Sequence, residues 1–260
     1  MLGDFVLVVG PAGASGASRL DRPQDWPRLP MADPQVRHAS PAPGVRLWWR
    51  GAVDVHPGPR GALGLALEPF HGGPAAAAQR PLARPVADWL AGRSVDPSRQ
   101  CGRFSFVGWD AAASSVLAIS DAFRTGTLVW ASTERGIVVA SDLRLLAATG
   151  LVAVEPSRAA LYQYLNFGVV PAPLTALEGV HKLPGGCRLA LRIGGEPRVE
   201  AWWDARYPAD LGGSDDERAA RLRERIVDTV EDYRCGDAEG WGAFLSGGTD
   251  SSSICGILAR

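Results

Sequence analysis

The 260-residue sequence lacks a marked charge of either sign. Its 27 lysines and arginines nearly balance 28 aspartates and glutamates, which leaves a formal net charge of −1. Surfaces that bind nucleic acid or acidic lipid usually carry a clear excess of lysine and arginine, often in clusters. We therefore expect that the protein binds neither nucleic acid nor a membrane surface.

Cysteine is also scarce, and its four copies share no paired spacing. They are Cys101, Cys187, Cys235 and Cys255. A disulfide scaffold or a structural zinc site needs cysteines at recognisable intervals. The sequence argues against both.

Long hydrophobic runs are missing as well. No stretch reaches the roughly 18 apolar residues of a transmembrane helix. The first ten residues, MLGDFVLVVG, have no basic segment and too short an apolar run for a secretory signal. We interpret Phe5–Val9 as a strand and expect a cytoplasmic protein.

The most informative segment that is present is WGAFLSGGTDSSSICGILAR, from Trp241 to Arg260. The apolar run Ala243–Leu245 predicts a strand, which is followed by a glycine turn and a helix that starts near Ser251. Adjacent glycines let a ligand approach the backbone, and free N–H groups at a helix start favour phosphate. A Walker loop would need a lysine after its last glycine, and none is present. The structural alternative is a tight turn with polar caps.

Arg260 follows soon after that helix begins. One strand and one helix cannot enclose a nucleotide, because α/β domains bind ligands at the carboxyl ends of several strands. We therefore expect the natural protein to continue past Arg260.

Upstream, short β-type runs are separated by Asp, Ser, Gly and Thr clusters and predict an antiparallel meander. These runs are Phe104–Trp109, Val116–Ile119, Leu128–Trp130 and Ile137–Ala140. The sequence also predicts helices over Asp142–Thr149 and Ser157–Phe167.

A longer helix is predicted after residue 213. Ser214 and Glu217 have the spacing of a capping box. The apolar residues that follow recur every three or four positions and predict one apolar face of an amphipathic helix. They are Ala219, Leu222, Ile226, Val230 and Tyr233.

Four stretches, in this order, resemble the glutamine-dependent asparagine synthetase family. They are GRFSFVGWD from Gly102, VVASDLRLLAATG from Val138, YLNFGVVPAPLTALEGVHKLPGGCRLAL from Tyr164 and LSGGTDSS from Leu245. The third stretch is the longest and most specific. The fourth is similar to the S-G-G-x-D-S loop of enzymes that split ATP into AMP and pyrophosphate.

The resemblance implies an α+β fold class. Residues 1–205 would form an αββα sandwich of the N-terminal-nucleophile glutaminase type. Residues 206–213 would be a linker, and residues 214–260 the truncated start of an α/β ATP pyrophosphatase-type domain.

The resemblance also implies ATP and Mg²⁺ as cofactors. A carboxylate would be adenylated, and an amine would then displace AMP. Asp250 would help to place magnesium, although a carboxylate there could simply stabilise the helix dipole. The backbone at Leu245 would meet the adenine side. The phosphate-binding donors would come from Ser246, Gly247, Gly248 and Ser251.

The first hundred residues depart from the family pattern. Leu2 stands where the family carries its nucleophilic cysteine, so no catalytic residue is assigned there. The glutamine-binding motifs Arg-Gly-Pro-Asp, Asn-Gly-Glu-Ile-Tyr-Asn and Gly-Asp-x-Glu are interpreted as missing, and Ser120-Asp121 replaces the usual Arg-Asp. We expect a degenerate glutaminase domain without hydrolysis. His181 and Lys182 are interpreted as a solvated turn, not as an acid–base pair.

Three functions remain open. The first is an amide ligase that joins ammonia to aspartate or an analogue. The second is an intramolecular cyclase, like the β-lactam synthetases and lasso-peptide macrolactam cyclases. The third is a non-catalytic interaction protein, against which the intact glycine loop argues. The expected substrate is a small-molecule or peptide carboxylate, and a homodimer is left open.

Overall fold

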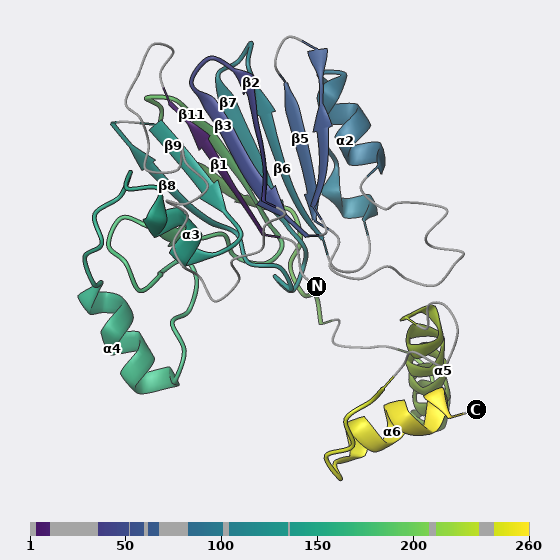
Figure 1. Cartoon of the computed structure of the whole chain (residues 1–260). Helices are drawn as coiled ribbons and strands as arrows, with labels where there is room; N and C mark the ends of the chain where they lie inside the picture. The colour runs from purple at the N-terminus through teal and green to yellow at the C-terminus, as the bar shows by residue number, and fades with distance from the viewer. Residues whose placement is uncertain are drawn as a thin grey trace. The chain divides into compact units, whose positions relative to one another are not determined.

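The computed structural model describes residues 4–10, 36–51, 53–59, 62–67, 83–100, 104–134, 136–207, 212–233 and 242–259. The chain divides between Asp204 and Ala205 into two compact units. Figure 1 shows the first unit as two layers of strands with helices, and the second as a pair of helices.

The first unit contains two six-stranded sheets in which all neighbouring strands are antiparallel. One sheet has the order β10-β8-β9-β1-β3-β2. Its strands are β1 (Asp4–Val9), β2 (Arg37–Ala42), β3 (Val45–Arg50), β8 (Val129–Thr133), β9 (Gly136–Ala140) and β10 (His181–Lys182). Leu7 pairs with both Leu47 and Val139, which places β1 near the centre of the sheet.

The second sheet has the order β12-β11-β7-β6-β5-β4. Its strands are β4 (Val53–Pro57), β5 (Leu63–Leu67), β6 (Ser105–Asp110), β7 (Ser115–Ser120), β11 (Cys187–Arg192) and β12 (Arg198–Ala201). The predicted meander is therefore wrong in one respect. Strands β6 and β7 pair with each other, and β8 and β9 pair with each other, but the chain changes sheet between β7 and β8.

The two sheets pack face to face around an apolar interior. Every second side chain along the strands of both sheets faces this interior, because successive side chains of a strand point to opposite faces. The largest of its fully buried side chains are Phe5, Leu7, Leu47, Leu63, Leu65, Leu128 and Ile137.

Helices cover the outer face of each sheet, as Figure 1 shows for α2 and α3. Helix α2 (Ala83–Leu90) packs Val86 against Phe106 of the second sheet. Helix α3 (Leu143–Ala148) packs Leu145 and Leu146 against the first sheet. The first unit thus has the αββα layering expected from the sequence.

The helices predicted over Asp142–Thr149 and Ser157–Phe167 are confirmed, and each has an N-cap side chain. The Asp142 carboxylate accepts a hydrogen bond from the N–H of Arg144 at 2.7 Å and caps α3. Helix α4 (Arg158–Phe167) follows the N-cap Ser157 and ends at Gly168, whose φ of 69° is left-handed. A 3₁₀ turn, η4, covers Pro97–Arg99.

The second unit contains helices α5 (Asp215–Tyr233) and α6 (Thr249–Leu258). The predicted capping box is confirmed. The N–H of Ser214 donates to the Glu217 carboxylate at 2.7 Å, and the N–H of Glu217 donates to the Ser214 hydroxyl at 3.3 Å. Among the helices that the structure describes, none is both long and apolar enough to cross a membrane.

One end of the sandwich gathers polar side chains. In the first sheet Asp4 pairs with Arg50, and in the second sheet Ser105 pairs with Ser120. These strand ends meet because β3 ends at Arg50 and β4 begins three residues later. The hydroxyl oxygens of both serines are buried and have no hydrogen-bond partner among the described residues.

A buried ion pair joins two strands at this end. The Nε of Arg50 donates to Oδ2 of Asp4 at 2.9 Å, and the two side chains are only 8% and 21% exposed. The Ser141 hydroxyl accepts a hydrogen bond from the N–H of Phe5 at 3.0 Å, next to this pair. A buried arginine that lost its carboxylate would keep an uncompensated charge.

Changing Gly136 to alanine should destabilise the first unit strongly. A Cβ at Gly136 would lie 2.2 Å from the carbonyl oxygen of Val9, and its φ is +134°. Backbone must move to relieve that clash, so the free energy of unfolding should fall by about 3 kcal/mol. In Gly150→Ala the new Cβ meets nothing within 4 Å, so only the left-handed φ of +67° contributes, about 1 kcal/mol. Urea unfolding followed by tryptophan fluorescence measures both, and equal losses would contradict the clash.

Asp4→Asn should also destabilise the protein, because it removes the carboxylate charge that pairs with the buried Arg50 guanidinium. We expect a loss of about 3 kcal/mol in the free energy of unfolding. Glu200→Gln is the control, since Glu200 pairs with Arg188 and Arg198 at the surface. It should cost less than about 1 kcal/mol. The same urea unfolding measures both, and a smaller effect at Asp4 than at Glu200 would refute the role of the buried pair.

Candidate functional site

The glycine loop of the second unit, residues 246–251, is held by hydrogen bonds of two serine hydroxyls. Oγ of Ser246 lies 2.9 Å from Oγ of Ser251, and the N–H of Ser246 donates to Oγ of Ser251 at 3.3 Å. Oγ of Ser251 donates in turn to the carbonyl oxygen of Gly248 at 3.2 Å. The loop therefore turns back toward the first turn of α6, and both hydroxyls lie at the surface.

The two glycines have separate roles in this turn. Gly247 has a φ of +81°, a left-handed angle that a side chain would strain. Gly248 is the N-cap of α6 and has no side chain that could accept a hydrogen bond from the first-turn N–H groups. These donors and the positive end of the helix dipole make the loop suited to bind an anion.

The remaining predicted residues of the loop are exposed. Asp250 lies in the first turn of α6, and Leu245 is 66% exposed. The strand predicted over Ala243–Leu245 is wrong, since residues 242–246 have no strand conformation and Phe244 is fully exposed. A strand forms by hydrogen bonding to a neighbour, and none of the described residues pairs with this stretch.

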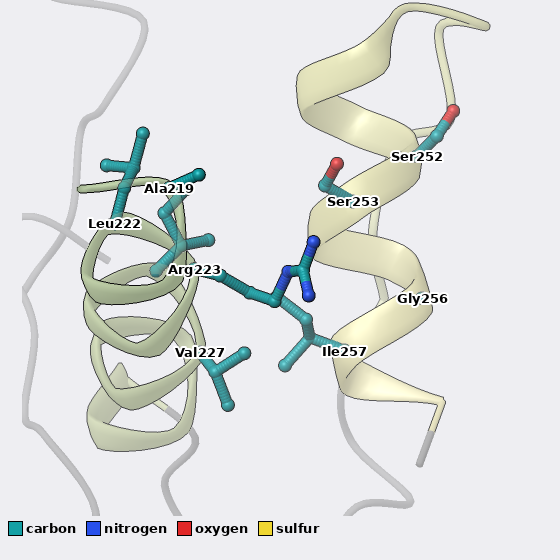
Figure 2. A pocket seen from close by; sticks show the side chains of 9 residues that line it. Ala219, Leu222, Arg223, Val227, Ser252, Ser253, Gly256 and Ile257 are labelled. Carbon is teal, nitrogen blue, oxygen red and sulfur yellow. The ribbon is translucent and has the colours of Figure 1, made fainter. Parts of the chain in front are cut away.

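Beside the loop, α5 and α6 enclose a groove of about 490 Å³. Figure 2 shows Arg223 extending from α5 across the groove toward α6. Leu222 and Ile226 of the predicted apolar face contribute to its lining, and they remain 62% and 42% exposed. The amphipathic pattern of α5 is therefore confirmed, but within the described residues its apolar face is only partly covered.

Several predicted features of the glutaminase half lie outside the described residues. Leu2 is one of them, and residues 68–82 are another such stretch of the first hundred residues. Of the residues that the structure describes, no group of three or more His, Cys, Asp or Glu could hold a metal ion.

The sequence interpretation missed Arg50, which lies at the polar end of the sandwich and pairs with Asp4. It follows two tryptophans at the end of β3, and Gly51 comes next. The dipeptide Arg50-Gly51 repeats the first half of the Arg-Gly-Pro-Asp motif and was the available signal. Its pairing with Asp4, a residue 46 positions earlier, could not be read from local pattern.

The interpretation of His181 and Lys182 as a solvated turn is wrong. Both form β10, which pairs with β8 at the edge of the first sheet. The imidazole of His181 packs on the indole of Trp130 with ring centroids 4.7 Å apart. Nζ of Lys182 donates to the carbonyl oxygen of Val170 at 2.7 Å. The expectation that these neighbours point to opposite faces of an extended chain agrees with their place in a strand.

Asp121, which the sequence pairs with Ser120 in place of Arg-Asp, organises the loop after β7. Its carboxylate accepts hydrogen bonds from the N–H of Phe123 at 2.9 Å and from the hydroxyl of Thr125 at 2.6 Å. It is almost fully buried, so its structural role is to hold this turn.

Comparison with known proteins locates the family resemblance in the first unit. Residues 92–203 match the glutamine amidotransferase domain family. The chain is 28% identical over 163 residues to asparagine synthetase (glutamine-hydrolyzing) 1 of Bacillus subtilis. The aligned stretch covers 62% of this chain and 25% of the relative.

Two fungal relatives are similar to the same extent. Amidase chry2 of Gibberella zeae is 28% identical over 162 residues, 61% of this chain and 23% of the relative. Amidase chyE of Penicillium rubens is 28% identical over 161 residues, again 61% of this chain and 23% of the relative. The matched part thus spans about a quarter of the length of these curated relatives. These matches confirm the resemblance that the motifs carry: residues 92–203 are similar to the glutamine amidotransferase domain family, and the chain is similar to an asparagine synthetase and to two amidases.

Proposed function

We propose that the protein is an ATP-dependent amide ligase that forms AMP and pyrophosphate and adenylates a carboxylate for attack by an amine. The observation that supports this most is the loop from Ser246 to Ser251. It combines an uncapped helix start, a left-handed glycine and two surface hydroxyls within a few residues. A purely structural turn has no need for so many small polar groups.

The chemistry explains why such a loop would be useful. A carboxylate is a poor acyl donor until one of its oxygens becomes part of a good leaving group. Adenylation achieves this and releases pyrophosphate, whose negative charge grows as its bond to the α-phosphorus breaks. The backbone N–H groups after Gly248 and the hydroxyls of Ser246 and Ser251 would hold those phosphate oxygens.

Asp250 fits a role with magnesium. In nucleotide sites Mg²⁺ is usually held by one or two carboxylates together with substrate phosphates and water. Asp250 is exposed at the start of α6, beside the N–H groups that would hold phosphate. When bound, the ion would neutralise charge on the departing pyrophosphate.

The amine is proposed to come from a source other than glutamine. Leu2 offers only hydrocarbon where an amidase would need a nucleophile. In addition, the Arg50 guanidinium is already engaged by Asp4, which makes it less available to a free carboxylate. Free ammonia would give an asparagine-synthetase-like ligase, whereas an amine of the substrate itself would give an intramolecular cyclase. Leu2 favours neither over the other.

Asp250→Ala in the full-length protein should abolish exchange of labelled pyrophosphate into ATP in the presence of the carboxylate substrate. The side chain is exposed, so folding should be unaffected. Asp216→Ala is the matched control, because Asp216 is also the second residue of an exposed helix start, in α5. The control should exchange at the normal rate. Exchange that survives in Asp250→Ala would remove this carboxylate from the site, and ADP as product would refute the loop assignment.

Glutamine hydrolysis should stay at background in the full-length protein, with or without ATP. The expected cause is the missing nucleophile at position 2, and Leu2→Cys alone should not restore activity while Asp4 still engages Arg50. Glutamate release measures both variants. Robust release by the unmutated protein would contradict the proposed degenerate state of this domain.

A further inference from the structure

Helix α4 is barely covered by the rest of the described chain. Ala160 is its only buried residue, and Figure 1 shows the helix standing apart from the strands of the first unit. Its large apolar side chains face solvent, and so does the valine that follows the helix. They are Leu161, Tyr162, Tyr164, Leu165, Phe167 and Val169, with exposed fractions between 53% and 75%. A helix with so much apolar surface is normally buried against another element.

Most of these side chains lie on one side of α4. Residues three and four positions apart share a helix face, so Leu161 and Leu165 form a stripe. Tyr162 and Tyr164 flank this stripe, one on each side. Arg158 lies at its N-terminal end, three residues before Leu161. We call these five residues the α4 face.

The exposed apolar area is large enough for a specific interface. An aromatic side chain offers about 150–250 Å², so the six exposed apolar residues present roughly 700 Å². A monomer rarely exposes a contiguous apolar patch of more than a few hundred Å². Two such faces placed together would bury about 1,200–1,400 Å², which reaches the size of specific protein–protein interfaces.

The charge of α4 matches a second copy of the same helix. Arg158 is the one charged residue of α4, and it stands in the first turn, where the helix dipole disfavours a cation. The last turn, where a cation would be favourable, has no basic residue. In an antiparallel pair, each Arg158 would lie beside the last carbonyl groups of the other α4 and could donate to them.

We propose that the α4 face is the self-association surface of this protein, on which two copies pair their α4 helices antiparallel about a two-fold axis. Under this symmetry the same patch serves both partners. Leu161 of one copy would pack on Leu165 of the other, between the tyrosines. A partner with a charged surface would leave its charges unmatched against these side chains. The pairing involves the first unit and does not depend on the proposed ATP chemistry.

Sedimentation velocity of the full-length protein over a concentration series tests the pairing. The unmutated protein should be a dimer at micromolar concentration. Leu165→Glu should raise the dimer dissociation constant at least about a hundredfold, because a carboxylate without a partner would be buried in both copies. Ala159→Glu is the matched control, since it adds the same charge to an exposed position of α4 outside the α4 face. It should leave the dissociation constant unchanged.

Two milder variants keep the test decisive if Leu165→Glu does not fold. Alanine is the best helix former, so Leu165→Ala should fold and should raise the dissociation constant at least about tenfold. Arg158→Gln should raise it about tenfold as well, because two contacts with helix C-termini are lost. Urea unfolding of the Arg158→Gln monomer should show no loss of stability, since a cation in the first turn is unfavourable there. An arginine with a structural role within its own chain would not give this combination.

A full-length protein that stays monomeric across the series would overturn the proposal. So would an unchanged dissociation constant in both Leu165→Ala and Arg158→Gln, which would place the dimer contact elsewhere. A monomer that Leu165→Ala destabilises toward urea would assign the α4 face to another segment of the same chain.

Discussion

The packing of two antiparallel sheets against each other is the interaction on which the first unit depends. Strands that are far apart in sequence contribute alternate residues to one apolar interior, and helices α2 and α3 close the two outer faces. Such an interior tolerates few polar groups, because a buried polar atom without a partner costs free energy. Charged side chains are therefore confined to the outer faces, the strand ends and the loops.

That confinement determines where chemistry can occur in this unit. The Asp4–Arg50 pair lies where β1 begins and β3 ends, and the loop with Asp121 and Arg124 lies where β7 ends. Buried charges at such positions need a partner inside the protein or from a ligand. Arg50 pairs with Asp4 inside the protein, whereas Nη1 of Arg124 has no hydrogen-bond partner among the described residues.

In the second unit, the shape of the glycine loop depends on local hydrogen bonds and not on packing between sheets. Its loop is held by short-range hydrogen bonds between Ser246, Gly248 and Ser251, so the backbone shape comes from neighbours in sequence. By contrast, the apolar face of α5 lines a groove and stays partly exposed in the described residues. The loop can thus form its local hydrogen bonds although, within the described residues, the apolar face of α5 is only partly covered.

Features that depend on near neighbours in sequence were predicted well. The limits of β9 lie within one residue of the predicted run Ile137–Ala140, and the capping box of α5 follows from Ser214 and Glu217. Turns and caps are formed by residues two to four positions apart, so a linear pattern contains all the partners. The family resemblance rested on the same kind of local motif.

Other features depend on partners that only the folded chain brings together. The sequence by itself determined strands β1, β6, β7, β8 and β9, the helices and the glycine loop. Only the tertiary structure decided that β7 and β8 belong to different sheets, that Arg50 pairs with Asp4 and that Lys182 lies in an edge strand. It also decided that Ala243–Leu245 is no strand. The physical reason is the same in each case, because strand pairing and burial of charge are set by residues distant in sequence.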